Sequence, residues 1–172
     1  FPSRSLQEDT VALMDALGIA RAHLLGHSVG SSIAQELVLS HPDRADRLIL
    51  VSGTCGGEKM VSMRQEIWET LNDKRGTGRD LANRMFSVLF PHEWLAGHDP
   101  WQYCPEVRER TSEESVSKQA EALSSWPGTY ERLPGIRSPT LVVTGSEDVV
   151  IPPENAVTLT ERIPGARLVQ FP

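Results

Sequence analysis

A single pentapeptide constrains this chain more than any other feature of its sequence. Residues 26–30 read Gly-His-Ser-Val-Gly, and they lie between the short, mostly apolar run 22–25 and a segment with apolar residues at helical spacing. A serine at this spacing is typical of a sharp turn from a strand into a helix, where flanking glycines let neighbouring backbone approach and the hydroxyl is exposed. We therefore interpret Ser28 as a candidate nucleophile rather than as an incidental serine in a glycine-rich turn.

The order of strands and helices around this turn predicts an α/β fold with a mostly parallel sheet and flanking helices. The helix after Ser28 leads into the apolar run 48–51. A strand, a crossover helix and a second strand form a βαβ unit, in which the two strands are parallel. The same order returns near the end of the chain, where the run 140–144, a helix after Pro153 and the run 167–171 follow one another.

The middle of the chain has a different character. From residue 55 to about residue 135 no strand pattern occurs, and all four tryptophans lie in this stretch. We therefore expect a helical cap at residues 55–135, inserted between the core segments 1–54 and 136–172. Aromatic and methionine side chains of the cap could line an apolar binding site, although a helical stripe of this kind more often forms core. The candidates are Met60, Met63, Phe86, Phe90, Trp94 and Trp101.

The composition excludes several classes of protein. The chain has 17 Lys and Arg against 23 Asp and Glu, a formal net charge of −6, whereas a nucleic-acid-binding protein needs a basic patch. Its apolar runs are too short to span a bilayer. Cys55 and Cys104 are too far apart in the sequence to indicate a zinc motif or a disulfide framework. We expect a cytoplasmic protein that binds a small-molecule substrate, without a metal, a cofactor or contact with a membrane.

Asp148 is the second candidate for chemistry. It follows the apolar run 140–144 after a short turn. The carboxyl ends of parallel strands form the edge at which open α/β sheets bind their ligands. A carboxylate at that edge could orient a histidine and stabilise its imidazolium ion. Asp148 could instead bond to its own turn backbone, and the neighbouring Glu147 is a rival carboxylate that we expect to be solvated.

These motifs together resemble the α/β-hydrolase fold superfamily, in its branch with a serine nucleophile and a helical cap. The resemblance covers residues 5–53 and 139–172, which bracket the predicted cap. It rests on the Gly-His-Ser-Val-Gly turn, His-Pro-Asp-Arg at residues 41–44, Gly-Ser-Glu-Asp at residues 145–148 and Ile-Pro-Pro at residues 151–153.

The resemblance implies a role for each candidate residue. Ser28 would be the nucleophile, Asp148 the triad acid, and the backbone amide of Val29 one donor of the oxyanion hole. His27, next to the nucleophile, would contact the substrate. The implied activity is that of a serine hydrolase for a small apolar carboxylic ester or thioester, acting through an acyl-enzyme. Lactone, carbon–carbon and peracid chemistry are alternatives on the same residues.

The sequence departs from the family pattern on both sides of these motifs. The family's catalytic histidine follows the acid, but residues 149–172 contain no histidine. The strands and loop that precede the nucleophile turn, including the first oxyanion donor, are also unmatched. We therefore expect these groups to lie outside residues 1–172, in a longer protein, and we expect residues 1–172 alone to be inactive. The alternative is a non-catalytic ligand-binding or signalling protein on the same fold.

Overall fold

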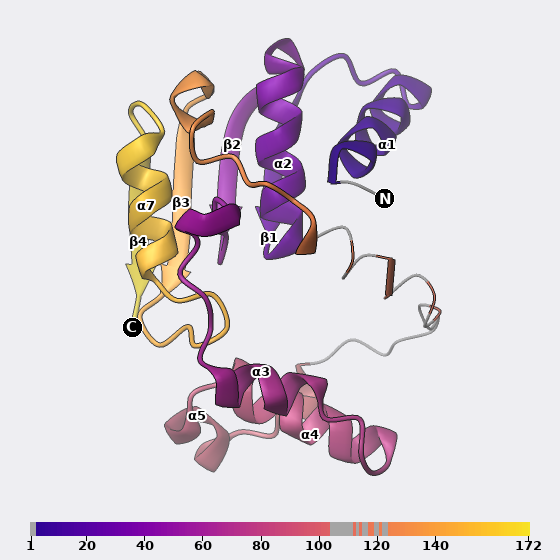
Figure 1. The fold of residues 1–172 in the computed structure, drawn as a ribbon, viewed down its shortest axis with the longest axis vertical. Helices are drawn as coiled ribbons and strands as arrows, with labels where there is room; N and C mark the ends of the chain where they lie inside the picture. Colours follow the sequence, from indigo (N-terminus) through magenta and orange to yellow (C-terminus); the bar gives the residue numbers. More distant parts are fainter. Residues whose placement is uncertain (1–2, 104–111, 113, 115–116, 119–120, 122–123) are drawn as a thin grey trace.

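The computed structural model describes residues 3–103, 112, 114, 117–118, 121 and 124–172, and it contains one parallel sheet (Figure 1). Its strands follow one another in the order β1-β2-β3-β4, each paired in parallel with the next. The predicted parallel sheet is therefore confirmed. The strands are β1 (Ala22–His27), β2 (Ala45–Val51), β3 (Thr140–Gly145) and β4 (Arg167–Phe171).

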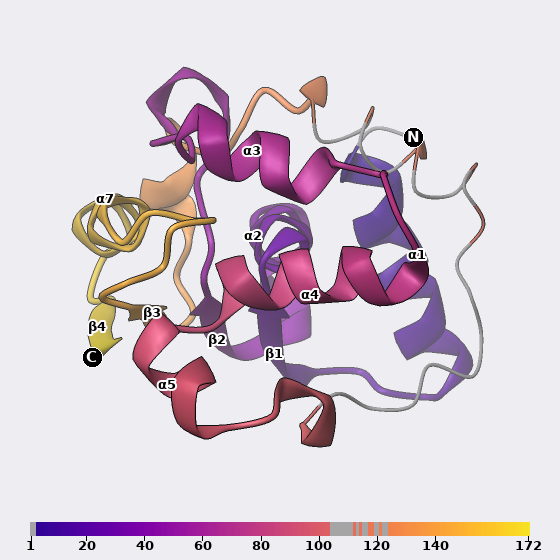
Figure 2. The ribbon, with the colours of Figure 1, turned by 90° about the horizontal axis from the view of Figure 1, so that it is seen from below.

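Helices cover one face of this sheet. Helix α2 connects β1 to β2 and α7 connects β3 to β4, and Figure 2 shows both helices on the same side of the sheet. Alternate strand residues point toward them, so Leu48, Leu50 and Val142 are fully buried beside Leu159 of α7. Helix α1 packs on α2 rather than on the sheet. The bounds are Ser3–Ala16 for α1, Val29–Ser40 for α2 and Glu154–Arg162 for α7.

The opposite face of the sheet carries apolar side chains that the described part of the chain leaves exposed. They belong to the other set of alternating strand residues, such as Leu25 on β1 and Val169 and Phe171 on β4. The core of the described chain therefore lies between the sheet and the layer formed by α2 and α7.

Between β2 and β3 the described residues form helices and no strand. Helices α3, α4 and α5 lie together beyond the edge at which the strands end (Figures 1 and 2). The division into segments 1–54, 55–135 and 136–172 stays a prediction. The elements are η2 (Gly57–Lys59), α3 (Gln65–Asn72), α4 (Gly78–Leu89), α5 (His92–Gly97), η3 (Pro100–Gln102) and η4 (Leu133–Gly135).

Buried polar contacts tie both ends of this helical segment to the core. At its far end, the Thr129 N–H donates to the Cys55 carbonyl at 2.7 Å, and the Thr129 hydroxyl donates to the Gln35 amide oxygen at 2.6 Å. At its near end, the Asn155 side chain of α7 accepts from the Val61 N–H at 3.0 Å and donates to the Val61 carbonyl at 2.8 Å. Side chains of the core therefore hold the chain near both ends of the helical segment.

A buried carboxylate reinforces the far end. Glu36 of α2 accepts a hydrogen bond from the Trp126 indole at 2.9 Å and another from the Arg132 guanidinium at 2.8 Å. The hydrogen bond to Glu36 raises the pKa of Arg132, so this guanidinium stays charged. A buried carboxylate is tolerated in the core when its oxygens are hydrogen-bonded and paired with a cation in this way.

Candidate active site

Ser28 lies between the last residue of β1 and the first residue of α2. Its backbone has φ 52° and ψ −120°, a conformation that is strained for any residue with a side chain. Two hydrogen bonds hold it: the Ser28 N–H donates to the Val51 carbonyl at 3.0 Å, and its own carbonyl accepts from the Ser31 N–H at 2.9 Å. The pairing of β1 with β2 and the first turn of α2 therefore fix the sharp turn that the sequence predicts.

The two glycines that flank this turn have different roles. A Cβ atom at Gly26 would lie 2.3 Å from the Gly30 carbonyl oxygen, so only glycine permits this approach of strand and helix. A Cβ atom at Gly30 would meet nothing within 4 Å. The prediction that both glycines permit close backbone approach is thus right for Gly26. It is wrong for Gly30, which already belongs to α2 and where an added Cβ atom would contact none of the described residues.

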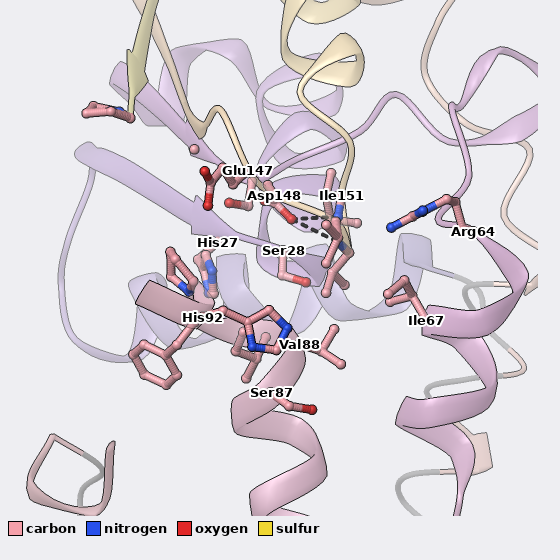
Figure 3. A pocket seen from close by; sticks show the side chains of 18 residues that line it. His27, Ser28, Arg64, Ile67, Ser87, Val88, His92, Glu147, Asp148 and Ile151 are labelled. Atoms are coloured by element: carbon pink, nitrogen blue, oxygen red, sulfur yellow. Dashed lines mark hydrogen bonds between the residues drawn. The ribbon is translucent and has the colours of Figure 1, made fainter. Parts of the chain in front are cut away.

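A cavity of about 750 Å³ opens in front of Ser28, between the carboxyl edge of the sheet and the helical segment (Figure 3). His27, Ser28, Glu147 and Asp148 line it from the sheet side. Of the aromatic and methionine candidates among the described residues, Phe90 alone lines it. Residues of the helical segment that form the opposite wall include Arg64, Ile67, Ser87, Val88, Phe90 and His92.

The other aromatic candidates pack mainly on one another. Phe86 is buried and meets Trp101 edge to face, with ring centroids 5.0 Å apart. Trp94 stacks on Phe90 at 4.7 Å. Most of this aromatic stripe therefore belongs to the packing of the helical segment, which is the interpretation that the sequence favoured.

Asp148 reaches the same cavity from the turn after β3. Its Oδ1 atom accepts hydrogen bonds from the N–H groups of Val150 at 3.1 Å and Ile151 at 2.8 Å. Asp148 therefore bonds to its own turn backbone, and these bonds hold its carboxylate at the cavity wall. Its role as an acid that orients a histidine stays a prediction. Glu147 also lines the cavity and is exposed, whereas Asp148 is half-buried.

The remaining predicted residues also lie at this edge. Val29 is the first residue of α2, so its N–H belongs to the turn whose amides have no partner within the helix. His27 ends β1 and points toward the cavity in Figure 3. Two further residues, Ser52 and His92, line the cavity. The position of Ser52 directly after β2 could have indicated it, but no local pattern points to His92.

Two further properties of the described residues bear on function. They contain no group of three or more His, Cys, Asp and Glu side chains arranged to hold a metal ion. None of the helices in the described part of the chain is long and apolar enough to cross a membrane.

Comparison with known proteins gives relatives that are named as hydrolases. A protein of Caulobacter sp. (strain K31) named "Putative carbamate hydrolase RutD" is 32% identical over 171 residues, which are 95% of this chain and 62% of the relative. The 2-hydroxy-6-oxo-6-phenylhexa-2,4-dienoate hydrolase of Comamonas testosteroni is 32% identical over 167 residues, covering 92% of this chain and 57% of its own length.

A solved structure shows the same relationship. The enol-lactonase of Burkholderia xenovorans LB400 superposes with a TM-score of 0.79 at 25% identity, covering 99% of this chain and 65% of that one. The chain therefore spans less than two-thirds of the length of each of these three proteins. The sequence model of the α/β hydrolase fold family matches residues 1–172. With the parallel sheet and the strained turn at Ser28, this match shows that the chain belongs to the α/β hydrolase fold family.

Proposed function

We propose that the intact protein is a serine hydrolase in which Ser28 attacks the carbonyl of a small carboxylic ester or thioester. The observation that carries the proposal is the strained turn at Ser28, which opens on the same cavity as Asp148. A residue with positive φ and a side chain persists only where its surroundings hold it, and such residues gather at active sites.

In the proposed reaction the Ser28 hydroxyl oxygen attacks the carbonyl carbon while a histidine, oriented by Asp148, takes the hydroxyl proton. The oxyanion that forms accepts a hydrogen bond from the Val29 N–H. The alcohol or thiol then departs with the proton from the histidine, which leaves an acyl group on Ser28, and water removes this group by the same steps. Residues 149–172 contain no histidine, so the reaction is proposed for the intact protein and not for residues 1–172 alone.

The cavity and the relatives support hydrolysis of a small molecule. A volume of about 750 Å³ is in the usual range for small-molecule sites, and we propose that His27 contacts the substrate there. The names of the relatives refer to a carbamate, a dienoate and an enol lactone. These names agree on hydrolysis and differ in substrate, so the choice of an ester or thioester rests on the residues of this chain.

A fluorophosphonate probe tests the proposal, because it reacts covalently with an activated serine and far more slowly with an ordinary one. We expect the intact protein to be labelled at Ser28, and Ser28→Ala to abolish both labelling and ester turnover. The control is Ser146→Ala, which removes an exposed hydroxyl from the turn before Asp148 and should leave labelling intact. Labelling of the Ser28→Ala variant would refute the nucleophile. A wild-type protein without any labelling would favour the non-catalytic, ligand-binding alternative.

A further inference from the structure

Ser52 shares with Ser28 a positive φ, which no other non-glycine residue in the described chain has. Its φ is 44°, against 52° for Ser28. Each serine directly follows the last residue of its strand, and those last residues, His27 and Val51, are paired. The Ser52 N–H donates to the Val143 carbonyl at 2.9 Å, just as the Ser28 N–H bonds to β2. Two strained serines therefore lie side by side at the carboxyl ends of neighbouring strands, and both line the cavity.

Crowding at the next residue requires a glycine at position 53 but gives no reason for a serine at position 52. A Cβ atom at Gly53 would lie 2.0 Å from the Ser31 hydroxyl, so the chain leaving β2 passes close over α2. A glycine at position 52 would adopt the same positive φ without strain, whereas a serine does so at a cost in stability.

The described residues make no use of the Ser52 hydroxyl. In the described part of the chain this hydroxyl has no hydrogen-bond partner. Another serine of the cavity wall, Ser87, differs in this respect, because its hydroxyl donates to the Arg84 carbonyl at 2.7 Å. A strained serine with an unused hydroxyl in the cavity wall is the arrangement expected of a group reserved for a ligand.

We infer that Ser52 is a specificity-determining residue whose hydroxyl hydrogen-bonds to the acyl group of the substrate. This inference rests on the proposed role of Ser28. Neighbouring strands lie about 4.8 Å apart, so a hydroxyl beside the nucleophile reaches an atom one or two bonds from the reacting carbonyl carbon. A hydroxyl both donates and accepts, so the favoured acyl groups carry an ether, hydroxyl, carbonyl or amide there. The substrate class is therefore an ester or thioester of a small acid with a polar atom near its carbonyl.

Two esters of equal chain length isolate this contact. In 4-nitrophenyl methoxyacetate an ether oxygen replaces one methylene of 4-nitrophenyl butanoate, and the leaving group is the same. Ser52→Ala removes the hydroxyl and keeps the strain, whereas Ser52→Gly removes both. In the intact protein we expect each variant to lower the ratio of kcat/KM for methoxyacetate to that for butanoate by about fivefold to tenfold, the effect of one hydrogen bond. We expect Ser52→Gly to melt about 2–4 °C above Ser52→Ala, because glycine relieves the strain.

The outcomes separate this inference from the proposed function. The matched control is Ser146→Ala, which removes an exposed serine hydroxyl from a residue that does not line the cavity and should move the ratio less than about twofold. If the Ser52 variants leave the ratio unchanged while Ser28 is still labelled by the fluorophosphonate, the role of Ser52 is overturned and the proposed function is not. A Ser52→Gly variant that melts no higher than Ser52→Ala would overturn the premise of strain. A wild-type protein that is neither labelled nor active on either ester would refute the proposed function and this contact with it.

Discussion

The nucleophile turn contains two glycines whose replacement by alanine should have opposite effects. In Gly26→Ala the added methyl group would lie 2.3 Å from the Gly30 carbonyl oxygen and 2.7 Å from the Ser31 Cα atom. Both atoms belong to the backbone, so no flexible side chain can move aside. In Gly30→Ala the same methyl group would meet nothing within 4 Å, at a position inside α2.

The magnitudes follow from these contacts. Overpacking a well-packed site costs about 1–3 kcal/mol and more where backbone must move, so we expect Gly26→Ala to lower the free energy of unfolding by at least about 3 kcal/mol. Replacing a glycine inside a helix by alanine stabilises it by about 0.5–1 kcal/mol, so Gly30→Ala should raise the same free energy. The two variants should therefore differ by about 4 kcal/mol although their compositions are identical.

Urea unfolding of the intact protein, followed by tryptophan fluorescence, measures this difference directly. The slope of the free energy against urea concentration should be the same for both variants, which would show that only stability has changed. Labelling of Ser28 by the fluorophosphonate should slow in Gly26→Ala, because the added methyl group displaces the backbone of the turn that holds Ser28. Equal free energies of unfolding for the two variants would refute the close approach of residues 26 and 30.

Two further predictions concern the polar and sulfur groups of the core. Glu36→Gln removes the charge that pairs with Arg132 and that accepts the hydrogen bond of the Trp126 indole. It should therefore lower the free energy of urea unfolding by about 1–3 kcal/mol. A double-mutant cycle with Arg132→Gln that shows no coupling would contradict the pairing. Cys55 is buried, and burial raises the pKa of its thiol. In a Cys104→Ser variant at about pH 8, a disulfide reagent should therefore react with Cys55 only after unfolding. Rapid reaction of the folded protein would contradict this burial.

The parts of this fold that depend on local pattern were predictable from the sequence. Apolar runs separated by amphipathic helices imply parallel strands, and parallel strands bring their carboxyl ends to one edge, so Ser28 and Asp148 were expected to lie together. The strain at Ser52 and the place of His92 in the cavity wall depend on how α2 crosses β2 and how the helical segment folds back. Those are long-range contacts, and no short pattern in the sequence encodes them. Gly30 shows the reverse error, because a familiar motif suggested a steric need that the helix does not have.

The hydrogen bond between Thr129 and Cys55 has a consequence for how this protein can vary. It brings the two ends of the helical segment together, so the segment between them forms a closed loop that is held to the core near both ends. Doubling the length of a closed loop adds only about 0.6 kcal/mol of closure entropy. The segment between residues 55 and 129 could therefore be exchanged for one of another length while the register of β2 with β3 is kept. Exchanging that segment between relatives should therefore change which molecules enter the cavity more than it changes the stability of the sheet.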